Sequence, residues 1–295
     1  MNVPKLVIHG GAGNAEMTPA RQQQLHEAIV LILKASYPIL TLNGASAGVL
    51  HAIKMLEDHP LFNAGTGSCL QLDGQIRMTA ALMNGKTHRF SGVINIQNIQ
   101  NPIQVAALLQ QEKNTVLAGD LATQYAHKKG VPFYDPLTPE RKAEFETRQT
   151  SNPVTTQENT SQKDTVGAVA IDQEGNIVAA CSTGGIGNEI PGRVSDCATV
   201  AGTYASLKAG VSCTGIGEEI VDYALAAKIV TRVEEGIALN KAVEKALTDG
   251  RLANNAYGLI ALDSHGNIQV GKTTRHLVYG HYDGTNLKTF FPESH

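Results

Sequence analysis

The chain has 295 residues, of which 42% are apolar and 17% charged, and its formal net charge is -3 at pH 7. This composition is typical of a soluble globular protein and excludes a disordered chain or a small domain stapled by disulfides. Lys and Arg together number 24 against 27 Asp and Glu, so the basic surface of a nucleic-acid-binding protein is missing and we expect no nucleic-acid partner.

No uninterrupted apolar run approaches the length of about 18 residues that a membrane span needs, and the first residues lack the apolar core of a signal peptide. We therefore expect a cytoplasmic protein with no membrane partner. The four cysteines show no C-x-x-C spacing, which predicts reduced, buried side chains at Cys69, Cys181, Cys197 and Cys213.

The first half of the chain is predicted to alternate between strands and helices. A short buried strand at residues 6–8 leads into glycines at 10–13, and Thr18 then caps a helix that begins near Pro19. The further expected elements are a helix capped by Ser46 and ending at 58–60, a hairpin around Asp73 and Gly74 with strands at 70–73 and 75–78, a helix after Pro102, and a helix over 116–126.

The middle of the chain changes character sharply. Of the fifteen residues from Thr150 to Asp164, ten are Ser, Thr, Asn or Gln, and only Val154 is aliphatic. Such a segment cannot bury enough apolar surface to order itself, so we expect a mobile tail over about 135–164. The apolar run 166–171 that follows directly predicts a buried strand.

The second half of the chain carries two similar hairpin patterns, over 167–177 and 258–268, each with Gly-Asn in its turn. The residues 218–230 and 238–247 between them have helical spacing. With antiparallel pairing expected throughout, the pattern favours an α+β sandwich in which helix layers surround sheets. The length alone allows one or two domains.

One motif points to a different class of enzyme. Residues 44–48 match G-x-S-x-G, the nucleophile elbow of the α/β-hydrolases, which makes a serine esterase using Ser46 an alternative. An elbow must follow a strand, whereas Ser46 is followed by a helical pattern, so helix capping explains it more simply.

Neither a nucleotide nor a zinc site is indicated. The glycine-rich loops match neither the phosphate-loop nor the dinucleotide fingerprint, and no H-E-x-x-H is present. We therefore expect no organic cofactor.

The junction between Asp164 and Thr165 suggests another chemistry. A hydroxyl nucleophile needs a base, and a threonine that is the first residue of a chain can use its own α-amine, whose ordinary pKa is near 8. That requires a cut before Thr165, which a polar tail ending at a rigid strand would suit. The alternative is an ordinary boundary between a loop and a strand.

Downstream residues favour the catalytic interpretation. The second strand of the first hairpin ends so that the Thr183 hydroxyl lies beside the start of the Thr165 strand. Arg193 and Asp196 offer a cation and an anion that could grip the carboxylate and ammonium of an amino-acid-like substrate. Thr214 precedes a helix, where a hydroxyl and backbone N–H groups can form an oxyanion hole. The plainer alternatives are a surface ion pair for Arg193 and Asp196, and a helix cap for Thr214.

Six blocks stand in order along the chain: residues 7–13 (VIHGGAG), 56–65, 164–170 (DTVGAVA), 182–185 (STGG), 191–194 (PGRV) and 214–218 (TGIGE). As a set they resemble the plant-type asparaginase/isoaspartyl peptidase family, a branch of the N-terminal-nucleophile hydrolases. The resemblance implies a single domain over 1–295 with a four-layer αββα sandwich. It also implies a precursor that cuts itself into an α chain, 1–164, and a β chain, 165–295, two of each forming the mature enzyme.

The resemblance further implies a role for individual residues. Thr165 would be both the autocleavage residue, after Asp164, and the nucleophile, with Thr183 hydrogen-bonded to it. Arg193 would bind the substrate α-carboxylate and Asp196 its α-amino group. The remaining implied roles are an oxyanion site at Thr214 and Gly215, a pocket wall at Gly217, support of the nucleophile by Asn63, and a structural sodium ion on the backbone carbonyls of Leu56, Glu57, His59, Phe62, Ala64 and Thr66.

The implied substrates are L-asparagine and β-aspartyl dipeptides, hydrolysed through a β-aspartyl-enzyme intermediate. Some positions depart from the family pattern and bear on substrate preference: Ser195 and Cys197 beside Asp196, Thr79, Asn84, and the segment 272–276. A second alternative to the enzyme is an unprocessed, non-catalytic member that only binds small molecules.

Overall fold

Two β-sheets form the centre of the molecule, and the computed structural model describes residues 2–150 and 165–291. The larger sheet contains β1 (Lys5–Gly13), β2 (Met78–Asn84), β3 (Arg89–Ile96), β4 (Val116–Ala118), β5 (Val166–Ile171), β6 (Ile177–Thr183), β11 (His276–Tyr282) and β12 (Leu287–Thr289). The smaller sheet contains β7 (Thr203–Ala205), β8 (Ala209–Gly215), β9 (Tyr257–Asp263) and β10 (Ile268–Lys272). The strand orders are β12-β11-β1-β5-β6-β2-β3-β4 and β10-β9-β8-β7.

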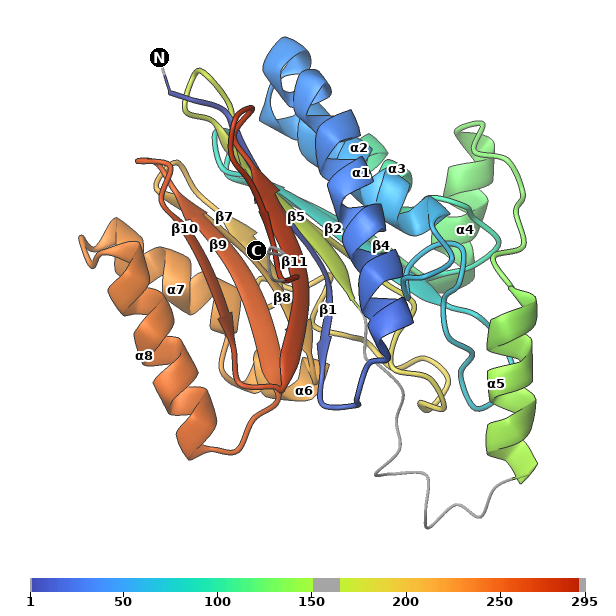
Figure 1. Cartoon of the computed structure of the whole chain (residues 1–295). Coiled ribbons are helices and arrows are strands. Elements are labelled where there is room, and N and C mark those ends of the chain that lie inside the picture. The colour runs from blue at the N-terminus through green and yellow to red at the C-terminus, as the bar shows by residue number, and fades with distance from the viewer. Residues whose placement is uncertain (1, 151–164, 292–295) are drawn as a thin grey trace.

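Helices cover the outer face of each sheet (Figure 1). The helices are α1 (Pro19–Asn43), α2 (Ala45–Asp58), α3 (Pro102–Leu109), α4 (Gly119–Lys128), α5 (Pro139–Thr150), α6 (Gly217–Asp222), α7 (Leu225–Glu234) and α8 (Leu239–Leu252). The helices α1 and α2 pack on the larger sheet, whereas α7 and α8 pack on the smaller one. The expected α+β fold with four layers is confirmed.

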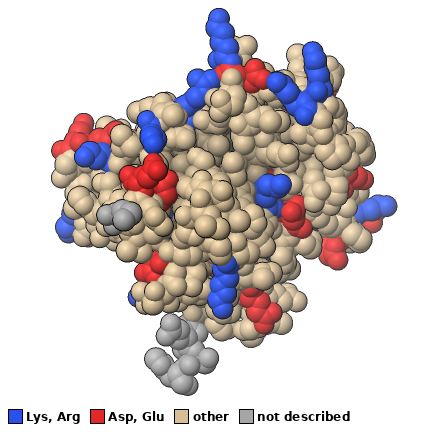
Figure 2. Space-filling model, turned by 90° about the horizontal axis from the view of Figure 1, so that it is seen from above, with Lys and Arg blue, Asp and Glu red and all other residues tan. Residues whose placement is uncertain are grey.

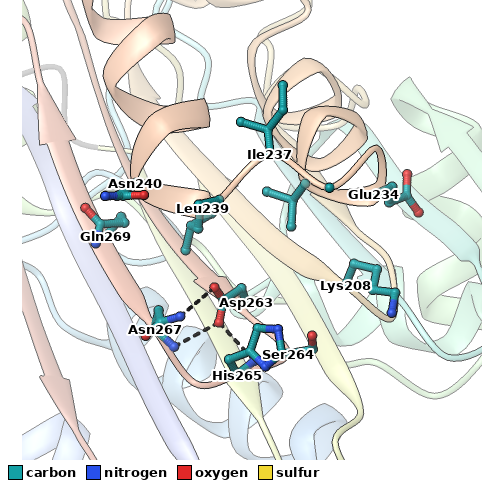
Figure 3. Close-up of a pocket in the computed structure, with 13 residues that line it drawn as sticks. Lys208, Glu234, Ile237, Leu239, Asn240, Asp263, Ser264, His265, Asn267 and Gln269 are labelled. Atoms are coloured by element: carbon teal, nitrogen blue, oxygen red, sulfur yellow. Dashed lines mark hydrogen bonds between the residues drawn. The ribbon is translucent and has the colours of Figure 1, made fainter.

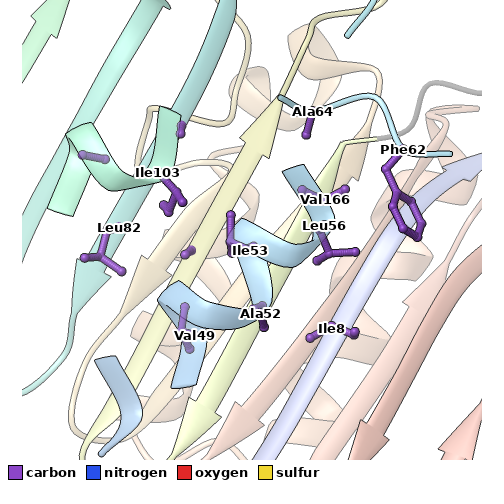
Figure 4. Packing of buried hydrophobic residues seen from close by; sticks show 14 of the residues in the cluster. Ile8, Val49, Ala52, Ile53, Leu56, Phe62, Ala64, Leu82, Ile103 and Val166 are labelled. Carbon is purple, nitrogen blue, oxygen red and sulfur yellow. The ribbon is translucent and has the colours of Figure 1, made fainter. Parts of the chain in front are cut away.

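Three apolar layers hold the four structural layers together. Figure 4 shows Ile53 and Leu56 of α2 lying over Ile8 and Val166 of the larger sheet. Val7, which precedes Ile8 on β1, points the other way and packs with the smaller sheet. Because the central strands are buried on both faces, they read in the sequence as continuous apolar runs rather than as alternating ones.

The helix α1 is long and apolar enough to span a membrane by length and composition alone. Its buried residues, including Leu25, Ile29 and Leu33, belong to the apolar cluster on the larger sheet. That packing marks α1 as a core helix of the sandwich. Thr18 caps it as predicted, accepting a hydrogen bond from the Arg21 backbone N–H.

The predicted capping role of Ser46 is wrong. The helix α2 begins at Ala45, and the residue before it, Gly44, has a φ of +84° that suits glycine. The Ala45 backbone N–H donates instead to the carboxylate of Asp172, which lies 127 residues further along the chain. A cap supplied from so far away leaves no local sequence signal.

The hairpin predicted around Asp73 and Gly74 is only a turn. Gly74 has the expected positive φ, but β2 begins at Met78 and the flanking residues form no strands. Side chains hold this loop, because Arg77 donates to both Asp73 and Gln71. The pairing is also not antiparallel throughout, since β3 and β4 are parallel.

The segment expected to be a mobile tail from about residue 135 contains the helix α5. Arg141 anchors this helix by donating from Nε to the Gly67 carbonyl at 2.6 Å. The rest of the predicted tail, 151–164, lies outside the described residues. The predicted helix over 218–230 is interrupted at Ala224, whose φ is +46°.

The two predicted hairpins of the second half are confirmed. Asp172 and Asp263 occupy the same place in the turns of β5–β6 and β9–β10. Each carboxylate accepts hydrogen bonds from the backbone and side chain of the asparagine four residues later, Asn176 or Asn267.

Candidate functional site

Two threonines meet where β5 begins and β6 ends. Antiparallel pairing places Val166 opposite Ser182, and the Thr165 hydroxyl donates to the Thr183 hydroxyl at 3.1 Å. The Thr183 oxygen also accepts the backbone N–H of Gly185 at 3.0 Å. The predicted neighbourhood of Thr165 and Thr183 is therefore present.

Thr214 approaches the same place from the smaller sheet. A Cβ placed on Gly210 would touch Val169, and one placed on Gly167 would touch Ser212, so β5 and β8 face each other in opposite directions. From this series we infer that Thr214 lies at the level of Thr165. The Thr214 Oγ1 atom is buried and has no hydrogen-bond partner within residues 2–150 and 165–291. A buried unpaired hydroxyl in a native site is available to a ligand.

Glycines are required where the chain passes this region. Gly215 has a φ of +135°, and a Cβ there would lie 2.4 Å from the Ala256 carbonyl oxygen. At Gly217 a Cβ would lie 2.8 Å from Nη2 of Arg193 and 2.9 Å from Oδ1 of Asp196. The absence of a side chain at Gly217 keeps these two charged groups reachable.

Arg193 is already engaged by two carboxylates. Its Nε and Nη2 atoms donate to Glu218 at 2.6 and 2.9 Å, and Nη1 donates to Glu189 at 3.2 Å. Burial lowers the pKa of Arg193, but the carboxylates outweigh this and raise it overall. Glu189 is buried, whereas the Glu218 side chain is 55% exposed, so Glu218 covers the solvent side of the guanidinium.

Asp196 is a buried carboxyl with spare hydrogen-bonding capacity. Burial raises its pKa to about 7, although the Arg193 charge acts in the opposite direction. Its Oδ2 atom has no hydrogen-bond partner among the described residues. A cationic group placed here would satisfy that oxygen and favour the ionised carboxylate.

Asn63 joins the loop after α2 to the end of β6. Its Nδ2 atom donates to the Gly185 carbonyl, and its Oδ1 atom accepts the Cys69 backbone N–H at 2.9 Å. Gly184 lies against the same side chain, since a Cβ there would be 2.5 Å from Asn63 Oδ1. Asn63 therefore supports the Thr183 loop rather than touching Thr165 itself.

The six carbonyls proposed for sodium lie in the loop from α2 to residue 66. Those of Leu56, Glu57 and His59 each accept one backbone N–H. The carbonyls of Phe62, Ala64 and Thr66 accept no hydrogen bond from the described part of the chain. That part also contains no group of three or more His, Cys, Asp or Glu side chains arranged for a metal.

Sequence reasoning missed two buried polar pairs beside the threonines. Ser182 Oγ donates to Oε1 of Glu57 at 2.6 Å, and burial raises the pKa of this glutamate to about 8. His9 Nε2 lies 3.0 Å from Ser212 Oγ. Both pairs join residues more than 120 positions apart, so no local spacing could have predicted them. Glu189 pairs with Arg193 four residues later, but this segment is not helical, so the spacing alone gave no signal.

The residues that depart from the family pattern have ordinary structural roles or none that the contacts explain. Thr79 pairs with Thr183 across β2 and β6, and the Cys197 sulfur lies 3.5 Å from the Thr79 carbonyl oxygen. Asn84 Nδ2 lies 3.4 Å from Ser46 Oγ, at the far end of β2. Ser195 has a buried hydroxyl without a partner in the described ranges.

A separate pocket of about 640 Å³ lies between the β9–β10 turn and the loop joining α7 to α8 (Figure 3). Lys208, Glu234 and His265 are among its lining residues, and none of the predicted site residues lines it. A second pocket of about 570 Å³ includes Ser46 in its wall but no histidine or carboxylate that could activate a serine. Asp164 lies outside the described residues.

Charge is sparse on the face shown in Figure 2, where basic and acidic side chains are interspersed rather than gathered by sign.

The candidate site combines the Thr165 hydroxyl just before a strand, the hydroxyls of Thr183 and Thr214, and the charged pair Arg193 and Asp196, beside which Gly217 leaves space. This arrangement can bind a zwitterion and attack a carbonyl next to it.

Comparison with known proteins gives full-length matches. The Asparaginase family model matches residues 2–291. An isoaspartyl peptidase/L-asparaginase of Synechocystis sp. is 43% identical, over 96% of this chain and 89% of the relative. A plant-type L-asparaginase of Pyrococcus abyssi is 36% identical, over 93% of this chain and 94% of the relative. An isoaspartyl peptidase/L-asparaginase of Macaca fascicularis is 35% identical, over 92% and 87% respectively.

Proposed function

The chain belongs to the asparaginase family, and on that premise we propose that it is a self-processing hydrolase of β-aspartyl dipeptides and L-asparagine with Thr165 as its nucleophile. One observation carries the assignment of Thr165. Its hydroxyl is held by Thr183 at the residue that immediately precedes the buried strand β5, directly after the segment 151–164. A serine esterase and a non-catalytic binding protein are both disfavoured by the family membership and by the names of the relatives.

The maturation step would use the same hydroxyl as turnover. Thr165 Oγ1 attacks the Asp164 carbonyl carbon, the peptide C–N bond breaks, and the acyl group passes to the oxygen as an ester. That step already frees the Thr165 α-amine, and water then hydrolyses the ester, which frees the Thr165 hydroxyl and leaves a carboxylate on Asp164. The new amine, with an ordinary pKa near 8, can accept the hydroxyl proton in later cycles.

In turnover, the substrate headgroup would be held by its two charges. Arg193 pairs with the α-carboxylate through its planar guanidinium, and Asp196 takes the α-ammonium. Thr165 then attacks the β-carbonyl, ammonia or an amino acid leaves, and water hydrolyses the β-aspartyl ester. Thr214 Oγ1 and the Gly215 N–H would stabilise the oxyanion. The unpaired Thr214 hydroxyl supports this role.

The substrate carboxylate must compete with Glu218 for Arg193. Glu218 binds two of the three guanidinium nitrogens from the solvent side, whereas Glu189 binds the third from the buried side. The buried Glu189 would keep Arg193 oriented when Glu218 is displaced.

A sodium ion bound by the loop carbonyls would stiffen the support of the nucleophile. Backbone oxygens suit a hard cation, and the carbonyls of Phe62, Ala64 and Thr66 accept no backbone hydrogen bond within the described residues. The same loop carries Asn63, which bonds to Gly185. Replacing sodium by choline during dialysis should lower the melting temperature, and an unchanged value would exclude the ion.

For the assembly, we propose a dimer of αβ heterodimers that works in the cytoplasm. Large apolar side chains are exposed around the substrate loops, at Ile190, Val194, Val200 and Val221, where a second copy could cover them. Light scattering of the mature protein tests the dimer directly.

A denaturing gel of the purified protein tests the central proposal. We expect two bands that correspond to 164 and 131 residues, with a new N-terminus at Thr165. The Thr165→Ala variant should remain intact and inactive, whereas Thr123→Ala on α4 should cut and hydrolyse normally as a matched control. An intact wild-type chain, or an active Thr165→Ala variant, would refute the proposal.

A further inference from the structure

The proposed nucleophile and the proposed oxyanion donor are carried by different sheets. Thr165 directly precedes β5 of the larger sheet, and Thr214 lies near the end of β8 in the smaller one. Their separation depends on how the two sheets pack. That packing is mostly apolar, built from side chains such as Val169, Ile177 and Ile260. Apolar contacts are not directional, so a hydrogen bond between the sheets adds an orientation that they do not supply.

A buried hydrogen bond crosses between the sheets next to the threonines. His9 on β1 has its Nε2 atom 3.0 Å from Ser212 Oγ on β8, and both residues are fully buried. Ser212 Oγ donates its own proton to the Ala180 carbonyl on β6 at 3.1 Å. Ser212 must therefore accept from His9, which assigns the proton of the ring to Nε2.

The His9–Ser212 pair lies two residues along the strands from the threonines, on the side away from the strand ends. Gly167 of β5 lies against Ser212 of β8. Two residues from these, in the direction of the site, the chain reaches Thr165, just before β5, and Thr214 on β8. His9 is the β1 neighbour of Gly167 in the ladder, so its ring lies across the Gly167 backbone.

Gly167 makes the space that the bond requires. A Cβ at this position would lie 2.1 Å from both His9 Nε2 and Ser212 Oγ. Burial lowers the pKa of His9 to about 3, while the nearby Thr165 backbone partly opposes the shift. The imidazole is therefore neutral throughout the working range of pH, and it acts as a fixed donor.

We propose that His9 is a positioning residue for the reaction: its hydrogen bond to Ser212 fixes the distance between Thr165 and Thr214. The inference rests on the proposed roles of those two threonines. His9 touches neither substrate nor the attacking oxygen. It acts through Ser212, by holding the two sheets in register where the nucleophile and the oxyanion donor must converge.

Steady-state kinetics of Ser212→Ala and His9→Leu test the inference. Each change removes one end of the bond, and misplacement of a reacting group by about 1 Å can cost about 100-fold in rate. We expect kcat to fall between about tenfold and 100-fold in each variant, with KM within about twofold because Arg193 and Asp196 are untouched. The cut before Thr165 should slow in parallel.

A double variant separates positioning from two independent defects. If His9 and Ser212 act only through their mutual bond, Ser212→Ala combined with His9→Leu should be no slower than the slower single variant. Multiplying effects would overturn the inference, as would wild-type kcat in Ser212→Ala. Ser212→Ala removes a single oxygen, so it carries the test even if His9→Leu does not fold.

Two further variants complete the design. His9→Gln retains an N–H donor at a similar reach and should recover most of the kcat lost in His9→Leu. Ser91→Ala also deletes a buried hydroxyl with two hydrogen bonds, but on β3, and should keep kcat at the wild-type value. The acid limb of the kcat profile should not move in Ser212→Ala, since a shift would make His9 an acid–base group. Wild-type protein that neither cuts nor hydrolyses would instead refute the proposed function.

Discussion

Asn63 donates a hydrogen bond of 2.5 Å from Nδ2 to the backbone oxygen of Gly185, across 122 positions of sequence. Gly185 in turn donates its N–H to Thr183, which accepts the Thr165 hydroxyl, so the Asn63 side chain is two hydrogen bonds away from Thr183 and three from the proposed nucleophile. The bond thereby transmits the position of the loop after α2 to the Thr183 hydroxyl.

Truncating Asn63 should weaken both folding and catalysis. Asn63→Ala removes the donor to the buried Gly185 carbonyl and the acceptor of the Cys69 N–H, which should cost about 2–4 kcal/mol of stability. The kcat should fall about tenfold as Thr183 loses its support. Chemical denaturation and kinetics check this, and Asn176→Ala in the distant β5–β6 turn should leave kcat unchanged.

Replacing Thr183 separates its hydroxyl from its bulk. Thr183→Ala removes the acceptor of the Thr165 hydrogen bond, and we expect kcat to fall about 100-fold with KM little changed. Thr183→Ser keeps the oxygen and should recover most of the rate. Equal losses in the two variants would show that the methyl group, not the hydrogen bond, matters.

Arg193→Lys tests how the substrate carboxylate is held. A lysine cannot make the planar two-point contact, so KM should rise about tenfold or more while kcat changes less. Arg232, which pairs with Asp249 on α8, offers the matched control, because Arg232→Lys keeps the charge in a pair outside the site. An unchanged KM in Arg193→Lys would remove Arg193 from the proposed binding role.

Asp196 should govern the pH dependence of substrate capture. Burial raises the pKa of its carboxyl to about 7, so below that pH it is mostly protonated and cannot pair with an ammonium group. The kcat/KM should therefore fall with a single proton as the pH drops below about 7. The Glu218 charge contributes to the raised pKa, so Glu218→Gln should move this limb to lower pH.

The same pKa shift has an effect on stability. Because the folded-state pKa lies above the usual value of 3.8, the contribution of Asp196 to stability is present at low pH and is lost as the pH rises through about 7. The Asp196→Asn variant should therefore gain stability relative to the wild type as the pH increases from the ordinary pKa of 3.8 to about 7. Melting temperatures at about pH 5 and 8 measure the change. A constant difference would contradict it.

Ser46→Ala should be silent. The serine is the second residue of α2 and makes no cap, and among the described residues its hydroxyl has a single hydrogen-bond contact, at 3.4 Å with Asn84. We expect stability within about 0.5 kcal/mol of the wild type and full hydrolysis of β-aspartyl dipeptides. Loss of activity in this variant would support the alternative in which Ser46 is the nucleophile of a serine esterase.

Elements with strong local patterns could be predicted from the sequence. The apolar run at 166–171 and the turn at Gly175 both appear in the structure as β5 and the β5–β6 hairpin. The Thr18 cap also appears, because its partner is only three residues away. In each case, the interaction that forms the element lies within a few residues of it.

What the sequence concealed depends on distant partners. Asp172 caps α2 in place of Ser46. The segment around Asp73 and Gly74, predicted as a hairpin, is a loop held by the side chain of Arg77. Within the site, Glu189 and Glu218 meet Arg193 only after folding. The residues that surround a reactive group are supplied by tertiary structure, whereas the reactive group itself can be recognised by its motif.

The strand order of the larger sheet has a mechanical consequence for a chain cut before Thr165. In β11-β1-β5-β6-β2, strands from before and after the cut are interleaved, so that β1 lies between β11 and β5 while β6 adjoins β2. Strands of the two fragments would therefore alternate within one hydrogen-bonded sheet. Pulling them apart would mean breaking three complete ladders and opening the central core. Cleavage would thus release an amine at the nucleophile without releasing either half of the protein.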